Sequence, residues 1–470
     1  MDDIRRTRES HGADQPLPTT DILMSLSALA KSGAIGSIIK LVSAGLSFLM
    51  FVALALITDE RQFGLYSAAY AGASLASFFA SVGQQGTVLR FWPQYAGAND
   101  YASANSLMAR AILVALAGLA IASLLIFGLG YLPFAMTNVP EWLSLCGAAA
   151  GLCFALGWSE FTSGAFRAKN ALIFGLLPRD IIWRAAIIAA FVAARVMGIQ
   201  LSAVVALHLT AGLLVLSVVP QTVLLLRDTA RAERSSLTQH QKNEFRSVTL
   251  GLWGVTALPP ALAQVSTLLV AAILGAELAG AIFVADRTTR LVILALNGIN
   301  QALAPQISGA FYRGNKAHVQ RITSLAACGG FILALLVLAA YTIFAGPILS
   351  IFNPSYATPA LKATLIIFGI GATIGTACGP VELLLQLTGR QHALFKLLMI
   401  VNLVGLAVTA AATYLLGPVG AALSISGTIA AWTILGVLIA RRTLGINPSI
   451  FGFPMRNGLR GALTLLGSRS

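Results

Sequence analysis

Residues 281–305, AIFVADRTTRLVILALNGINQALAP, form a stretch that is long and apolar enough to cross a lipid bilayer as a helix. The stretch nevertheless carries Asp286, Arg287 and Arg290 well inside it. An ionised side chain at bilayer depth costs between ~3 and more than ~10 kcal/mol, so such side chains are rare, face inward and serve function. We therefore expect this helix to face protein or a water-filled cavity.

The polar residues of this stretch share one side of the expected helix. At ~100° per residue they fall within a sector of about 100°, whereas Val284, Ile293 and Leu294 point elsewhere. The polar set is Asp286, Arg290, Asn297, Asn300 and Gln301. We expect the carboxylate and the three amides of this set to form the polar lining of a cavity.

The composition is that of an integral membrane protein. The 470 residues are 57% hydrophobic and 10% charged, with a mean hydropathy of +0.82, whereas soluble domains carry about 25% charged residues. Long apolar segments without strand-like alternation predict helices rather than a β-barrel, so we expect an all-α fold. The net charge of +14 lies mostly in short loops, which indicates membrane topology rather than a nucleic-acid partner.

Twelve segments have the length of a membrane span, six on each side of a hydrophilic linker. Residues 1–31 are expected to form a cytoplasmic tail with a short amphipathic helix, and residues 442–470 a second cytoplasmic tail. We expect six-helix bundles over 32–226 and 247–441, joined by a cytoplasmic linker over 227–246. The predicted spans are about 32–57, 63–90, 106–132, 142–166, 172–197, 201–226, 247–275, 279–305, 322–345, 361–388, 393–416 and 419–440. The Pro259-Pro260 pair predicts a kink in the seventh span.

Lysine and arginine outside the spans are concentrated on one side of the membrane. That side holds both tails, Arg90, Arg110, Arg167, Lys169, the linker, the loop over 313–321, Arg390 and Lys396. The other side holds only Arg61, Arg195 and Lys362. Because cytoplasmic loops are enriched in positive charge, this asymmetry places both termini in the cytoplasm.

The sequence repeats once. TDERQFGLYSAAY (58–70) aligns with LGAELAGAIFVAD (274–286) at an offset of 216, and YAGAND (95–100) aligns with YRGNKA (312–317). EFTSGAFRAKNALIFGLL (160–177) aligns with ELLLQLTGRQHALFKLLM (382–399) at an offset of 222. Halves of six spans share one orientation, and such parallel repeats are typical of transporters with the cargo site between the halves.

Patterns of catalysis and metal binding are absent from the sequence. It contains no phosphate-binding loop, no H-E-x-x-H and no plausible nucleophile elbow. The four cysteines and five histidines lack disulfide or metal-ligand spacing. We therefore expect no enzymatic activity, no cofactor and no metal site. The short outward loop over about 346–361 also argues against a glycan polymerase or ligase.

Charged residues at membrane depth are the main functional candidates. Lys40 lies ~12 Å and Arg184 ~18 Å from the cytoplasmic ends of their spans, and Arg287 and Arg290 lie ~12–17 Å from the outer end of theirs. The i,i+4 pairs Asp180–Arg184 and Asp286–Arg290 are either self-neutralised or part of a site. Lys40 and Arg287 have no local partner. Four cations against two acids favour an anionic cargo, and guanidinium groups suit phosphate oxygens.

Glu160 and Glu382 are related by the repeat and fall close to the cytoplasmic ends of spans four and ten. Two interpretations remain open. Each glutamate either pairs with a nearby arginine, Arg167 or Arg390, or forms a gate or cation-coupling site.

Two turn motifs indicate a family. Phe63-Gly64-Leu65-Tyr66 follows the first span, and Leu416-Gly417-Pro418-Val419-Gly420-Ala421-Ala422 precedes the last helix. Together with the repeat and linker, they resemble the Wzx-type polysaccharide or O-antigen flippases of the multidrug/oligosaccharidyl-lipid/polysaccharide (MOP) flippase superfamily. The likeness covers about 25–441. It departs from the family at Asp59-Glu60, where members usually have Gly-Pro.

The resemblance implies two MATE-like six-helix bundles around a cationic cavity in a bacterial inner membrane. It implies a flippase for undecaprenyl-pyrophosphate-linked oligosaccharide, serving O-antigen, exopolysaccharide or capsule biosynthesis by alternating access. A polysaccharide polymerase and a chain-length regulator are possible partners. By the same resemblance, Lys40, Arg184, Arg287 and Arg290 would bind the pyrophosphate. The alternative is a cation-coupled multidrug or small-molecule exporter of the same superfamily.

The repeat sharpens the interpretation of the opening stretch. Arg287 and Arg290 align with Ala71 and Ser74 of the first half. A packing role common to both halves would place similar residues in both copies. Charge in only one copy favours a cargo site added to a duplicated scaffold.

Overall fold

The computed structural model describes residues 19–132 and 141–453, apart from side chains in parts of α1, α9 and α10 that include 290–302. Within these residues the protein is helical and contains no strand. The first half comprises α1 (Thr19–Ala55), α2 (Glu60–Ala80), α3 (Gln84–Gly97), α4 (Tyr101–Leu129), α5 (Trp142–Ala168), α6 (Leu172–Leu177), the π turn η1 (Pro178–Ile182), α7 (Trp183–Val196) and α8 (Ala203–Arg231). The second comprises α9 (Gln239–Leu274), α10 (Ala276–Tyr312), α11 (Lys316–Ser350), η2 (Pro354–Tyr356), α12 (Pro359–Ala377), α13 (Val381–Leu387), α14 (Gln391–Leu444) and η3 (Ile450–Gly452).

Each of the twelve predicted spans falls on one helix or on a run of consecutive helices. The span over 63–90 is divided into α2 and α3 at Val82 and Gly83, which have positive φ angles of 48° and 67°. The last two spans are the arms of α14, which reverses direction at Gly417 (φ 61°, ψ −139°). Eight helical stretches among the described residues have the length and hydropathy to cross a membrane. The predicted interruption at Pro259-Pro260 does not end α9, which is one helix through both prolines.

Polar caps fix where several helices begin. Asp59 accepts a hydrogen bond from the Gln62 backbone N–H and caps α2, so the residues that replace Gly-Pro in the turn motif have a structural role of their own. Thr238 and Gln241 form a reciprocal capping box at the start of α9. These caps satisfy backbone N–H groups that have no partner within the helix.

The repeat-related helices α2 and α10 cross at a pair of repeat-related glycines. α2 begins at Glu60 and α10 at Ala276, which differ by the predicted offset of 216. A Cβ atom on Gly280 would lie 3.1 Å from the Gly64 Cα, and one on Gly64 would lie 1.8 Å from the Ala276 carbonyl oxygen. Small residues permit this close backbone approach within a membrane. The crossing joins the two halves near the starts of both helices.

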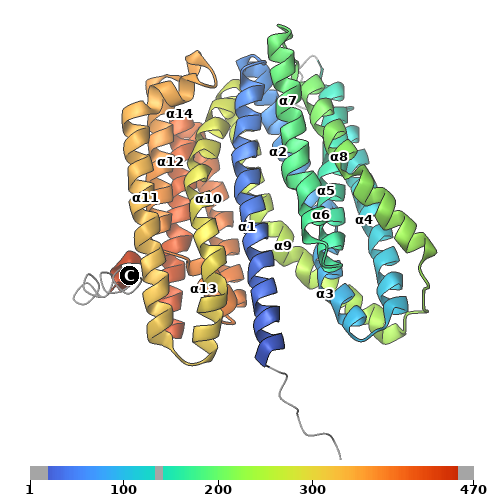
Figure 1. Ribbon diagram of the computed structural model, residues 1–470. Helices are drawn as coiled ribbons and strands as arrows, with labels where there is room; N and C mark the ends of the chain where they lie inside the picture. The colour runs from blue at the N-terminus through green and yellow to red at the C-terminus, as the bar shows by residue number, and fades with distance from the viewer. Residues whose placement is uncertain (1–18, 133–140, 454–470) are drawn as a thin grey trace, which may run out of the picture.

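Two groups of helices stand side by side, with α1 and α9 between them (Figure 1). α4, α5 and α8 pack together in one group, and α11, α12 and α14 in the other. α1 packs against α7 and α10, whereas α9 packs against α2 and α14. Because α9 contacts both groups, the bundle boundaries at 226 and 247 stay a prediction. The loops rich in Lys and Arg lie at the lower end in Figure 1, which we call the basic end.

Candidate functional site

A cavity of about 130 Å³ lies between the two halves. We call it the inter-half cavity. The first half contributes most of its lining, and α9 and α10 contribute one residue each. The lining residues are Tyr70, Ser74, Ser77, Phe78, Ser81, Gln85, Leu156, Gly157, Glu160, Arg179, Gln264 and Arg287. It thus contains two guanidinium groups, one carboxylate and several neutral polar groups.

Glu160 of α5 forms an ion pair with Arg179 of η1 at the wall of this cavity. Both side chains are mostly buried, with 27% and 20% of their surface exposed. The expected local pairing of Glu160 with Arg167 is therefore wrong. Whether Glu160 acts as a gate or coupling group stays a prediction.

Asp180 is the centre of a second charge cluster directly beside this pair. Its side chain is 3% exposed, and its Oδ2 lies 2.6 Å from the Lys40 Nζ. Its Oδ1 lies 3.5 Å from an Arg184 nitrogen and 4.0 Å from an Arg179 nitrogen. Asp180 is thus not simply the i,i+4 partner of Arg184. Of the three cations, Lys40 makes the shortest contact with Asp180, although the two residues are 140 positions apart in the sequence.

Arg184 is directed at the backbone of the π turn. It donates to the carbonyl oxygens of Arg179 and Asp180 at 2.8 and 3.0 Å, and to the Ser47 hydroxyl of α1 at 2.6 Å. Its guanidinium also lies 5.1 Å from the centre of the Trp183 ring. Arg184 does not line the inter-half cavity. These contacts favour a role in holding the π turn against α1, a turn type that often occurs at functional sites.

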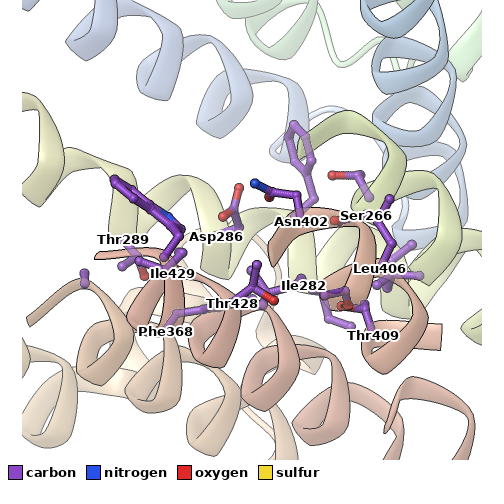
Figure 2. Close-up of a pocket in the computed structure, with 18 residues that line it drawn as sticks. Ser266, Ile282, Asp286, Thr289, Phe368, Asn402, Leu406, Thr409, Thr428 and Ile429 are labelled. Carbon is purple, nitrogen blue, oxygen red and sulfur yellow. Dashed lines mark hydrogen bonds between the residues drawn. The ribbon is translucent and has the colours of Figure 1, made fainter. Parts of the chain in front are cut away.

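Asp286 lines a different cavity from its neighbour Arg287. This second cavity, of about 230 Å³, lies within the second half between α9, α10, α12 and α14. Figure 2 shows Asp286 and Asn402 pointing into it from α10 and α14. Successive residues on a helix differ by ~100° in direction, which separates the two side chains. Asp286 thus lies at a cavity other than the one that contains Arg179 and Arg287.

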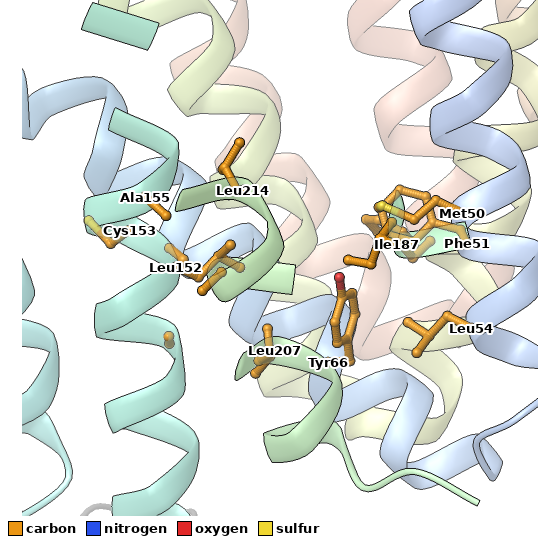
Figure 3. Packing of buried hydrophobic residues seen from close by; sticks show 14 of the residues in the cluster. Met50, Phe51, Leu54, Tyr66, Leu152, Cys153, Ala155, Ile187, Leu207 and Leu214 are labelled. Carbon is orange, nitrogen blue, oxygen red and sulfur yellow. The ribbon is translucent and has the colours of Figure 1, made fainter. Parts of the chain in front are cut away.

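Arg287 is held at the inter-half cavity by aromatic rings from both halves. Its guanidinium carbon lies 4.6 Å from the centre of the Phe283 ring and 5.6 Å from that of Phe51 on α1. Phe51 belongs to the buried cluster in Figure 3, together with Tyr66 of α2. Such cation–π contacts hold a guanidinium in a defined position.

The remaining predicted residues divide into two groups. Arg290, Asn297, Asn300 and Gln301 belong to α10, but their side chains lie outside the described residues. Glu382 is exposed on α13, where its carboxylate accepts a hydrogen bond from Gln386 at 3.1 Å, and among the described side chains it forms no ion pair with Arg390. It lines neither cavity.

Among the side chains that the structure describes, four cations and two acids meet at or beside the inter-half cavity. The cations are Lys40, Arg179, Arg184 and Arg287, and the acids are Glu160 and Asp180. Positive charge is in excess in this described set, which contains Arg179 in addition to the predicted Lys40, Arg184 and Arg287. The sequence interpretation missed Arg179, although its place in span five, next to Asp180, was a signal that was available. A guanidinium from each half facing one cavity is suited to binding an anion.

The fold and cavities define a class, the multi-pass membrane proteins with the fold of MOP-superfamily transporters. A structure described as the inward-facing conformation of a multidrug resistance MATE family transporter has 16% identity and a TM-score of 0.68, covering 88% of this chain and 98% of that chain. The outward-facing conformation of such a transporter has 17% identity and a TM-score of 0.61, covering 88% and 96%. A MOP superfamily transporter from Pyrococcus furiosus, described as having a binding pocket of reverse polarity, has 18% identity and a TM-score of 0.59, covering 88% and 96%.

The sequence itself identifies the family. Residues 29–311, more than half of the chain, match the family described as polysaccharide biosynthesis protein, and the chain belongs to that family. No curated protein matches the chain by sequence. The solved structures that share this fold are described as transporters.

Proposed function

We propose that this protein flips undecaprenyl-pyrophosphate-linked oligosaccharide across a bacterial inner membrane by alternating access, with both termini in the cytoplasm. The family supports a role in polysaccharide biosynthesis, and the fold supports transport. The observation that carries the proposal is the inter-half cavity with Arg179 and Arg287 on opposite halves. Phosphate oxygens accept hydrogen bonds from two guanidinium groups at once, so a bound pyrophosphate links the halves.

Glu160 serves in this proposal as the internal counter-ion of the empty site. It pairs with Arg179 at the cavity wall, where the pyrophosphate would compete for the same guanidinium. Asp180 and Lys40 lie just behind this pair. Lys40 has 52% of its side chain exposed on α1, which lies between α7 and α10. The polyprenyl tail would remain in the lipid beside α1 and α10 while the headgroup enters the cavity.

The cavity must widen for this cargo. Its volume of about 130 Å³ is below the ~300–1,000 Å³ of pockets that hold drug-sized ligands, and an oligosaccharide needs more space still. The backbones of α2 and α10 are already in contact at Gly64 and Gly280, at the end opposite the basic loops. Opening toward the basic end would therefore keep this crossing closed and admit cargo from the cytoplasm.

A cellular test uses the two cavity arginines. The double variant Arg179→Ala/Arg287→Ala is expected to abolish surface polysaccharide export while the protein remains in the membrane, because both phosphate ligands are lost. Arg110→Ala is the matched control, since Arg110 lies over Phe245 away from the cavity, and it should export normally. Normal export by the double variant would contradict the proposed site.

The second candidate, a small-molecule exporter, is favoured by one observation. The cavity of about 230 Å³ within the second half is lined mainly by apolar side chains and contains the Asp286 carboxylate, a combination that suits a small organic cation. This alternative predicts drug resistance on overexpression, loss of that resistance in Asp286→Asn, and no glycan defect on deletion.

A further inference from the structure

The neutral polar side chains of the inter-half cavity follow one face of α2. Tyr70, Ser74, Ser77 and Ser81 are spaced by four, three and four residues, which places them on one side of a helix. Gln85, four residues further on, continues this line on α3. We call Ser74, Ser77, Ser81 and Gln85 the polar track.

The polar track lines the same cavity as the two arginines. Toward its α2 end, Phe51 lies 5.7 Å from the Tyr70 ring and 5.6 Å from the Arg287 guanidinium. At its α3 end, a Cβ atom on Gly164 would lie 2.9 Å from the Gln85 Cβ, and Gly164 follows Glu160 by one helical turn. Because Gly164 and Glu160 belong to the same helix, α5 passes beside the Gln85 end of the track. Ser74 and Ser81, seven residues apart, are separated by about 10 Å along the α2 axis.

The hydrogen bonds within the polar track leave both donors and acceptors for a ligand. The Ser77 hydroxyl donates to the Ser74 carbonyl oxygen at 2.8 Å, so its lone pairs are available to accept. The Ser81 hydroxyl donates to the Gln85 Oε1 at 2.9 Å, so the Gln85 amide nitrogen is the end available to donate. Sugar hydroxyls donate and accept, and they match this mixture. Phosphate oxygens only accept, so an anion would use only part of it.

We infer that the polar track binds the sugar hydroxyls of the cargo and contributes to glycan specificity, while Arg179 and Arg287 bind its pyrophosphate. This assignment rests on the proposed flippase function. It divides the cavity into a charged part that recognises any lipid pyrophosphate and a neutral part that recognises the attached sugar. Ser77 is the specificity-determining residue that this division predicts most directly.

The test measures the affinity of the purified full-length protein for two probes. One is undecaprenyl pyrophosphate, and the other is the same lipid carrying a single N-acetylhexosamine. The wild type should bind the glycosylated lipid more tightly. Ser77→Ala should lower the ratio of the two affinities about 3- to 10-fold, the worth of one hydrogen bond, and Ser77→Thr should restore it.

A matched control separates this effect from helix destabilisation. The Ser217 hydroxyl on α8 donates to the Leu214 carbonyl oxygen at 2.8 Å, the same local bond as in Ser77, but lies outside the cavity. Ser217→Ala should leave the ratio unchanged. The sugar assignment would be overturned if Ser77→Ala left the affinity ratio unchanged, or if the wild type bound the two lipids equally tightly. If Arg287→Ala at the same time lowers the affinity for both lipids, the pyrophosphate site stands and only the sugar assignment fails. Wild-type protein that binds neither lipid would overturn the flippase proposal as well.

Discussion

At the scale of single residues, Asp180 determines how the charges are arranged. One nearly buried carboxylate lies within 4.0 Å of nitrogens from Lys40, Arg179 and Arg184. Removing one member of a buried ion pair leaves the others without compensation in a low-dielectric environment. Asp180 therefore offsets part of the positive charge behind the cavity, whose own charged lining groups are Glu160, Arg179 and Arg287.

Asp180→Asn should destabilise the protein. We expect a loss of about 3 kcal/mol in the free energy of unfolding, the low end of the range for a broken buried pair, because the Lys40 side chain is half exposed. Asp228→Asn is the control. It breaks the 3.1 Å pair with Lys169, in which the Asp228 side chain is 55% exposed, and should cost about 0–1 kcal/mol. Unfolding in detergent measures both variants, and equal losses would contradict the central role of Asp180.

At the scale of elements, the segment that follows α14, residues 446–453, packs against α11 at the basic end of the second half. The Gln320 amide of α11 donates to the carbonyl oxygens of Asn447 and Gly452, both at 2.7 Å, and accepts from the Asn447 backbone N–H at 2.6 Å. The same segment covers the break between α12 and α13, where a Cβ atom on Gly379 would lie 2.2 Å from the Pro448 carbonyl oxygen. Gln320 thus ties the segment after α14 to α11 beside that break, together with the Ser324 hydroxyl, which donates to the Asn447 carbonyl oxygen at 3.2 Å.

Gln320→Ala should release this segment. Loss of three hydrogen bonds leaves the Asn447 backbone N–H without its side-chain partner, so amide hydrogen exchange over 446–453 should become faster while that of α5 stays unchanged. Gln386→Ala serves as the control, because Gln386 is exposed and donates only to Glu382. Unchanged exchange in Gln320→Ala would show that the segment is held by other contacts.

The close crossing of α2 and α10 at Gly64 can be tested by substitution. Gly64→Ala places a methyl group 1.8 Å from the Ala276 carbonyl oxygen, so the helices must separate, and we expect loss of folded protein and of export. Gly72→Ala on the same helix meets only the Leu268 side chain at 3.8 Å and should be tolerated. Fluorescence-detected size-exclusion chromatography distinguishes the two outcomes. Normal folding and export of Gly64→Ala would contradict the close crossing.

The sequence predicts features that depend on local or repeated patterns, and it does not predict contacts between distant segments. Hydropathy and the repeat offset place the helices, because both depend on residues close in sequence or duplicated. The pairings of Lys40 with Asp180 and of Glu160 with Arg179 join segments that are distant or separated by a turn, so i,i+4 spacing does not reveal them. The π turn that directs Arg179 toward Glu160 has no strong sequence signature. The placement of Asp286 and Arg287 in different cavities depends on how α10 packs.

At the scale of the whole molecule, the two halves contact each other at the Gly64–Gly280 crossing and along α9, and they line a small cavity with two arginines and one glutamate. The cavity is lined by both halves, so a ligand that binds Arg179 and Arg287 together stabilises one relative position of the halves over another. Release of Glu160 and binding of pyrophosphate are then alternative ways to neutralise Arg179. This exchange of partners connects cargo binding to movement of the halves.

The most direct test of the central claim is transbilayer movement of lipid-linked oligosaccharide by the purified protein in proteoliposomes. A labelled undecaprenyl-pyrophosphate-linked oligosaccharide is supplied, and its accessibility on each leaflet is followed over time. We expect wild-type protein to move the lipid, and folded Arg179→Ala/Arg287→Ala protein to move none above protein-free vesicles. Movement by the double variant at the wild-type rate would contradict the account.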